Sequence, residues 1–161
     1  MKYICPLIVV EDIRASRDFY EVLLEQKIKY DFGENITFEG DFAIHLRSHF
    51  SELIDGKPIR RGSNGFELYF EHDNIENLVE KLKFNNVEFL HEAREQPWRQ
   101  KVARFYDPDR HIIEIGESME FLSFRLSKEG KSTDEISKII NMPVDFVTGA
   151  IEEIQKPGHG S

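Results

Sequence analysis

The sequence predicts an α+β fold in which two similar modules form a curved mixed sheet around one cleft, followed by C-terminal helices. Three observations predict it. The order strand, helix and three strands occurs twice, a polar connector separates the two copies, and apolar residues at helical spacing fill the C-terminal part. We therefore expect a domain and an extension with these boundaries: domain 1–117, with modules at about 3–47 and 65–116, and helical extension 118–156.

The first module begins with an apolar, β-branched run at residues 3–10, which predicts a buried strand. Asp12 is a suitable N-cap for a helix that extends to about Gln26. Glycine and asparagine then divide the following residues into short segments. These segments predict three strands, at residues 28–32, 36–39 and 42–47.

A polar connector at residues 48–64 precedes the second module, which repeats the same order of elements. Asp73, with Glu76 three residues later, predicts the N-terminus of the helix. Residues 107–110 read Asp-Pro-Asp-Arg, which favours a turn between the last two strands. The strands of this module are predicted at residues 66–72, 87–90, 101–106 and 111–115.

The extension has the helix signals of a small helical unit. Ser132 with Glu135 predicts a capping box, and Pro143 suits a first helical turn. The segment resembles a helix-turn-helix of the G-x-S-x-x-E-I type. A DNA-binding recognition helix is basic, whereas the helix after Pro143 contains Asp145 and Glu152. We therefore expect no nucleic acid as partner.

Composition narrows the range of functions. The chain has 161 residues, 40% of them hydrophobic, and a formal net charge of −9, which disfavours binding to nucleic acids and anionic membranes. Its single cysteine, Cys5, forms no internal disulfide. The sequence contains no apolar stretch of membrane-spanning length and no secretory signal pattern. We expect a cytoplasmic protein without a membrane partner.

Two motifs resemble a known superfamily. Residues 6–20 read P-L-I-V-V-E-D-I-R-A-S-R-D-F-Y, and residues 105–115 read F-Y-D-P-D-R-H-I-I-E-I. They resemble the opening and closing segments of vicinal oxygen chelate proteins, which include glyoxalase I, bleomycin-resistance and fosfomycin-resistance proteins and extradiol dioxygenases. The resemblance covers about residues 3–116. Arg110 departs from it, because the family usually has glycine at this turn position.

In metal-dependent members, the resemblance implies four ligand positions on the inner face of the sheet. They fall on Cys5, His45, Glu67 and Glu114. A divalent metal bound there acts as a Lewis acid on substrate oxygens. Metal-binding relatives typically have histidine on the first strand of a module, whereas this chain has Cys5 and Glu67. The resemblance thus allows a divalent metal of unknown identity, or none.

Each candidate also has a structural interpretation. Cys5 is typical of a small buried residue, and His45 of a hydrogen-bonded wall residue. Two carboxylates on adjacent inner strands need a cation, a shared proton or an arginine partner. Arg47 and Arg104 are the candidate partners of Glu67 and Glu114, so a salt-bridge network is the alternative to a metal site.

Tyr69 and Trp98 are the aromatic candidates near the cleft. An aromatic side chain together with a guanidinium, that of Arg99 next to Trp98 or of Arg104 or Arg47, suits a flat or anionic ligand. The alternative role of Trp98 is to cover an edge of the core.

Two hypotheses on function follow. The first is a small-molecule-binding protein that binds an aromatic or anionic ligand in the sheet cleft, with or without a metal. The alternative is a metal-dependent lyase, isomerase or dioxygenase that uses Glu114, Glu67 and His45, with Glu114 and Glu67 as the catalytic carboxylates. In both cases the resemblance implies a homodimer with a small-molecule ligand or substrate.

Overall fold

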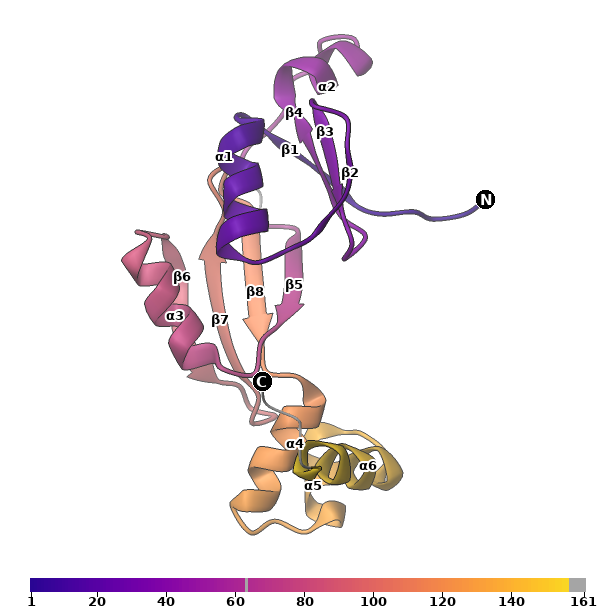
Figure 1. The fold of residues 1–161 in the computed structure, drawn as a ribbon, viewed down its shortest axis with the longest axis vertical. Coiled ribbons are helices and arrows are strands. Elements are labelled where there is room, and N and C mark those ends of the chain that lie inside the picture. The colour runs from indigo at the N-terminus through magenta and orange to yellow at the C-terminus, as the bar shows by residue number, and fades with distance from the viewer. Residues whose placement is uncertain (63, 157–161) are drawn as a thin grey trace. The chain divides into compact units, whose positions relative to one another are not determined.

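A computed structural model describes residues 1–62 and 64–156. It contains two four-stranded sheets and a C-terminal group of helices (Figure 1). The chain divides into two compact units: residues 1–67 with 106–112, and residues 68–105 with those from 113 onward. Within the described ranges, no helix is both long and apolar enough to cross a membrane.

The first module has the predicted order of elements. Its sheet has the order β1-β4-β3-β2, with β1 parallel to β4 and the other neighbours antiparallel. The Asp12 side chain accepts hydrogen bonds from the backbone N–H groups of Arg14 and Ala15, which confirms it as the N-cap. The elements are β1 (Leu7–Val10), α1 (Ile13–Arg17), the π-helical turn η1 (Asp18–Leu23), β2 (Ile28–Asp31), β3 (Asn35–Phe38) and β4 (Ala43–Leu46).

Aromatic rings fill the core of the first module. Tyr20 is fully buried and its ring contacts those of Phe38 and Phe42, at centroid distances of 5.7 and 5.2 Å. Phe38 and Phe42 stack on each other at 4.6 Å. Burial of these large apolar surfaces stabilises the sheet and fixes α1 and η1 against it.

The second module repeats the first in a sheet of order β5-β8-β7-β6. Its helix α3 contacts β6, beside which it runs in Figure 1. The side chains of α3 with helical spacing, Ile75, Leu78, Val79 and Leu82, are buried as the sequence predicts. The elements are β5 (Glu67–Glu71), α3 (Ile75–Phe84), β6 (Phe89–Glu95), β7 (Lys101–Tyr106) and β8 (Ile112–Gly116).

The helical extension consists of α4 (Met119–Lys128), α5 (Thr133–Ile140) and α6 (Val144–Gln155), which pack together (Figure 1). The capping box is present: Ser132 Oγ accepts from the N–H of Glu135, whose carboxylate accepts from the N–H of Ser132. A separate hydrophobic cluster holds the three helices together: Leu122, Leu126, Ile136, Ile140 and Val147.

Five local predictions are wrong. The first strand begins at Leu7 and not at residue 3, because its pairing with β4 begins there and the preceding segment exposes Tyr3 and Ile4. The connector is not entirely irregular, because α2 (Arg47–Leu53) follows β4 directly and places Arg47 on a helix. The α3 N-cap is Asn74, because the Asp73 carboxylate accepts from the N–H and hydroxyl of Ser118 instead. The first helix ends at Leu23, before a positive φ of 58° at Glu25. Finally, β6 continues to Glu95, beyond the predicted end at residue 90.

Candidate functional site

One face of the second sheet carries polar and aromatic side chains from adjacent strands. Side chains alternate between the two faces of a strand, so Glu114 and Gly116 of β8 share a face, opposite the buried Ile113 and Ile115. Arg104 of β7 contacts Glu114, which places Arg104 on the same face. We call this side of the sheet the polar face.

The carboxylate of Glu114 is held by a guanidinium. Arg104 Nη2 forms an ion pair with Glu114 Oε2, and the Glu114 side chain is 10% exposed. A second nitrogen of Arg104, Nη1, lies 3.4 Å from His91 Nε2 on β6. Because a buried carboxylate needs a compensating positive charge, Arg104 supplies what a metal ion would otherwise supply. The sequence named Arg104 as one of two candidate partners, and the geometry selects it.

A second group on the polar face joins two exposed aromatic rings. Tyr69 and Trp98 are 47% and 44% exposed, whereas Gln100 between them is 4% exposed. Trp98 Nε1 donates to Gln100 Oε1 at 2.8 Å, and Gln100 Nε2 lies 3.1 Å from the Tyr69 hydroxyl oxygen. The buried amide therefore binds the polar ends of both rings, while nearly half of each residue stays exposed.

This arrangement depends on a glycine. A Cβ atom at Gly116 would lie 2.7 Å from Gln100 Nε2 and 3.1 Å from the Tyr69 hydroxyl, both closer than ordinary van der Waals contact. Burial, and next the charge of Glu71, raise the pKa of Tyr69 to about 12, so its phenol is protonated at neutral pH. The hydroxyl thus remains a hydrogen-bond donor, and it donates to Glu71 Oε1 at 3.2 Å.

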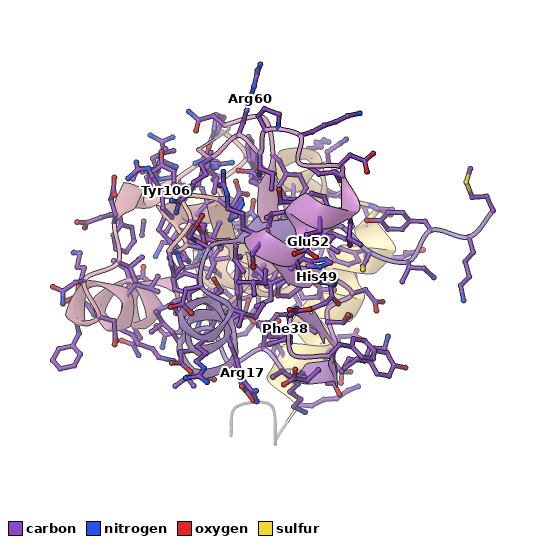
Figure 2. All side chains as sticks on the ribbon, turned by 90° about the horizontal axis from the view of Figure 1, so that it is seen from above. Arg17, Phe38, His49, Glu52, Arg60 and Tyr106 are labelled. Carbon is purple, nitrogen blue, oxygen red and sulfur yellow. The ribbon has the colours of Figure 1, made fainter. Side chains whose placement is uncertain are left out.

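The histidine candidate of the first module belongs to a different group. His45 of β4 is 6% exposed, and its Nε2 lies 2.9 Å from Nδ1 of His49 on α2, a helix that Figure 2 shows with His49 and Glu52 marked. His45 Nδ1 lies 3.3 Å from the amide nitrogen of Asn35, and His49 Nδ1 lies 3.3 Å from Glu34 Oε2. Burial, and next the neighbouring His49, lower the pKa of His45, which favours its neutral form.

The remaining candidates occupy simpler positions. Cys5 precedes β1 and is half-buried. Glu67 is the exposed first residue of β5. Arg47 donates to the carbonyl of Ile59 at 3.2 Å and lies 3.5 Å from Glu11 Oε2, both in the first unit.

The four predicted metal ligands include the carboxylate of Glu114. Glu114 is already neutralised by Arg104, and a guanidinium at ion-pair distance competes with a cation for the same carboxylate. In the part of the chain that the structure describes, no group of three or more His, Cys, Asp or Glu side chains has the geometry to hold a metal ion. Glu114 belongs to the second unit and the other three candidates to the first, so the metal set stays a prediction.

Sequence reasoning missed three contributors to these groups. Gln100 carried no signal, since a glutamine before a strand is ordinarily exposed. His49 lay in the supposed connector, and helix α2 brings it to His45. Gly116 follows the family motif directly, and a glycine at a strand end indicates close approach of another group.

Comparison with known proteins separates the two modules from the helical extension. Residues 3–120 match the family model of a glyoxalase-like domain, which leaves most of the helical extension outside the match. No curated protein matches the chain. Two solved structures from Agrobacterium tumefaciens and one from Fulvimarina pelagi illustrate the range of structural similarity.

A protein of unknown function from A. tumefaciens str. C58 is 39% identical, with a TM-score of 0.67 over 73% of this chain and 94% of that one. A glyoxalase-related enzyme from F. pelagi is 20% identical, with a TM-score of 0.64 over 73% and 88%. A lactoylglutathione lyase from A. tumefaciens is 17% identical, with a TM-score of 0.56 over 73% and 93%. The last two similarities concern the fold alone.

Proposed function

Because the chain belongs to the glyoxalase-like domain family, we propose that it is a small-molecule-binding protein that takes a flat aromatic ligand on the polar face without a metal. The observation that carries this proposal is the ion pair between Arg104 and Glu114. It neutralises the carboxylate at the ligand position that the family resemblance implies, so binding there needs no cation.

The ligand class follows from what is accessible on the polar face. Tyr69 and Trp98 expose their rings while Gln100 fixes their polar ends, an arrangement in which little side-chain entropy is lost when a ligand stacks. An anionic ligand has weaker support, because Glu114 already neutralises Arg104 and the chain carries a net charge of −9. We therefore favour the aromatic over the anionic ligand.

The alternative function, a metal-dependent lyase, isomerase or dioxygenase using Glu114, Glu67 and His45, requires Arg104 to release Glu114. It predicts stoichiometric binding of a divalent ion that Glu114→Ala abolishes. We expect titration with Zn²⁺, Ni²⁺, Mn²⁺ and Fe²⁺, followed by calorimetry and elemental analysis, to show no such binding. A tightly bound ion that is lost in Glu114→Ala would overturn the metal-free proposal.

Ligand binding can be followed at Trp98, because it is the only tryptophan in the sequence. We expect 4-nitrophenol to quench its emission and to release heat in calorimetry, and cyclohexanol to do neither. Trp98→Leu and Tyr69→Leu each remove one stacking ring. Each should weaken binding about fivefold to tenfold, because such aromatic contacts contribute about 1 kcal/mol. Calorimetry measures both variants, and fluorescence quenching also measures Tyr69→Leu.

The matched control is Tyr30→Leu. Tyr30 is also exposed, at 55%, and lies on β2 in the first module, stacked near Phe32. Its replacement should leave the affinity for 4-nitrophenol unchanged. Equal affinity in Tyr69→Leu and the unmodified protein, or a loss confined to Tyr30→Leu, would place the ligand elsewhere and contradict the proposal.

A further inference from the structure

We infer that Arg125, on the first helix of the C-terminal extension, is a positioning residue for the aromatic site, because it fixes the turn that carries Trp98. The inference rests on the proposed function in so far as the positioned group is a ligand site. It assigns a role to the extension, most of which lies outside the family domain.

Trp98 lies in a tight turn between β6 and β7. The N–H of Arg99 donates to the carbonyl of Gln96 at 2.8 Å, with Pro97 at the second position, where its fixed φ favours a turn. Arg99 has a φ of 71°, a left-handed conformation that is unfavourable for a residue with a side chain. Such a conformation persists where surrounding contacts hold it.

Those contacts come largely from α4. Arg125 Nη2 donates to the carbonyl oxygen of Arg99 at 2.6 Å, at the left-handed position itself. The side chain of Arg99 donates to Glu129 Oε2 at 3.0 Å, one helical turn beyond Arg125, and to Glu95 Oε1 at 2.6 Å. The backbone of Arg99 is therefore bound to α4, and its side chain to the C-cap residue of that helix.

The same guanidinium is anchored on a buried carboxylate. Arg125 Nε and Nη2 each donate to Glu117 at 2.9 Å, and the Glu117 side chain is 2% exposed. Glu117 also accepts from the N–H of Lys101 at its carboxylate and from Gln100 Nε2 at its carbonyl. Arg125 thus connects α4 to the two residues that follow Trp98: to Arg99 directly and to Gln100 through Glu117.

Only an arginine can make these contacts together. A guanidinium has five donors in a planar fork, so it can bind a carboxylate with two nitrogens and a carbonyl in addition. Arg125→Lys retains a positive charge beside buried Glu117 but lacks this fork. It should preserve the fold while releasing the carbonyl of Arg99, whereas Arg125→Gln also removes the charge.

The test uses the full chain and measures the acrylamide quenching of Trp98 emission without ligand, and then the affinity for 4-nitrophenol. Acrylamide quenching of Trp98 emission should rise about twofold in Arg125→Lys, and the dissociation constant of 4-nitrophenol should rise about tenfold, since a hydrogen bond to a charged group is lost. Lys128→Gln is the matched control, because Lys128 is a cation of α4 that lies over the Phe124 ring. It should change neither value.

The outcomes separate this inference from the proposed function. If the unmodified protein does not bind 4-nitrophenol, the proposed function fails, yet a selective change in acrylamide quenching in Arg125→Lys still supports positioning. If Arg125→Lys, with unchanged far-UV circular dichroism, matches the unmodified protein in quenching, the positioning role is contradicted. Should Arg125→Lys not fold, Glu129→Gln tests the same turn, because it removes the charge of one of the two carboxylates that bind the Arg99 side chain. Unchanged acrylamide quenching in Glu129→Gln would then contradict the inference.

Discussion

At the scale of single residues, the opening motif and the D-P-D turn of the closing motif are joined by hydrogen bonds within the first unit. The Tyr20 hydroxyl donates to Asp107 Oδ2 at 2.8 Å, and the N–H of Glu11 donates to Asp109 Oδ2 at 3.0 Å. The D-P-D segment therefore binds to the opening helix region. Arg110, where the family usually has glycine, adopts a φ of 67°, which gives the physical reason for that preference.

The buried hydroxyl of Tyr20 leads to the first prediction about stability. Tyr20→Phe should lower the free energy of unfolding by about 1–2 kcal/mol, because Asp107 loses a donor while its side chain stays fully buried. Urea unfolding measures this change. Tyr30→Phe, which alters an exposed ring, is the control and should leave the urea midpoint unchanged. Equal midpoints for both variants would show that the Tyr20 hydroxyl contributes no stability.

Alkaline pH should destabilise the protein through its tyrosines. Burial, and next Asp107, raise the pKa of Tyr20, and burial raises that of Tyr69 to about 12. In the unfolded chain both ionise near pH 10. Their contribution to stability is thus complete below about pH 10 and is lost as the pH rises toward their folded values. Absorbance at 295 nm should show late ionisation of Tyr20 and Tyr69, and Tyr20→Phe should remove the contribution of Tyr20.

Gly116 offers a test of the close contacts on the polar face. In Gly116→Ala the new methyl group would meet Gln100 Nε2 and the Tyr69 hydroxyl, so we expect the Trp98 emission maximum to move and ligand affinity to fall at least fivefold. Gly149→Ala, inside α6 with open space around it, should instead stabilise the protein by up to about 1 kcal/mol. An unperturbed Trp98 in Gly116→Ala would show that the neighbouring side chains shift freely.

At the scale of elements, the helical extension has its own core and its own helix caps. Leu126 and Ile136 are fully buried in the cluster that joins α4, α5 and α6. Leu126→Ala should therefore cost about 2–5 kcal/mol, and loss of the α5 cap in Ser132→Ala about 1 kcal/mol, by thermal unfolding. Leu53→Ala, at a 62% exposed position on α2, is the control. A cost below 1 kcal/mol for Leu126→Ala would contradict a packed extension.

At the scale of the whole molecule, the predicted homodimer is open to a direct measurement. Light scattering after size exclusion should give twice the 18.9 kDa mass of one chain. The N-terminal segment exposes Tyr3 and Ile4, at 77% and 63%, beside β1 at the edge of its sheet, so we expect Ile4→Asp to shift the mass toward the monomer. Val22→Asp, at a 67% exposed position on η1, should not. An unchanged mass in Ile4→Asp would exclude this segment from the interface.

Local sequence patterns were sufficient to predict the two modules, the order of their strands along the chain, the family and the capped helices of the extension. They could do so because hydrophobic period, caps and turn residues act over neighbouring positions. They placed α3 one residue early and missed α2, because the choice between Asp73 and Asn74 as cap depends on Ser118, 45 residues away.

The contacts of the candidate residues could not be predicted from the sequence and are known from the folded chain. The sequence left Glu114 between a metal and an arginine, since either compensates a buried carboxylate, and the structure pairs it with Arg104. The sequence predicted Tyr69 and Trp98 as candidates but not Gln100, which binds both. Gln100 is 31 residues from Tyr69 and 2 residues from Trp98. Such contacts depend on which strands become neighbours and on the direction of each side chain, and these are properties of the folded chain.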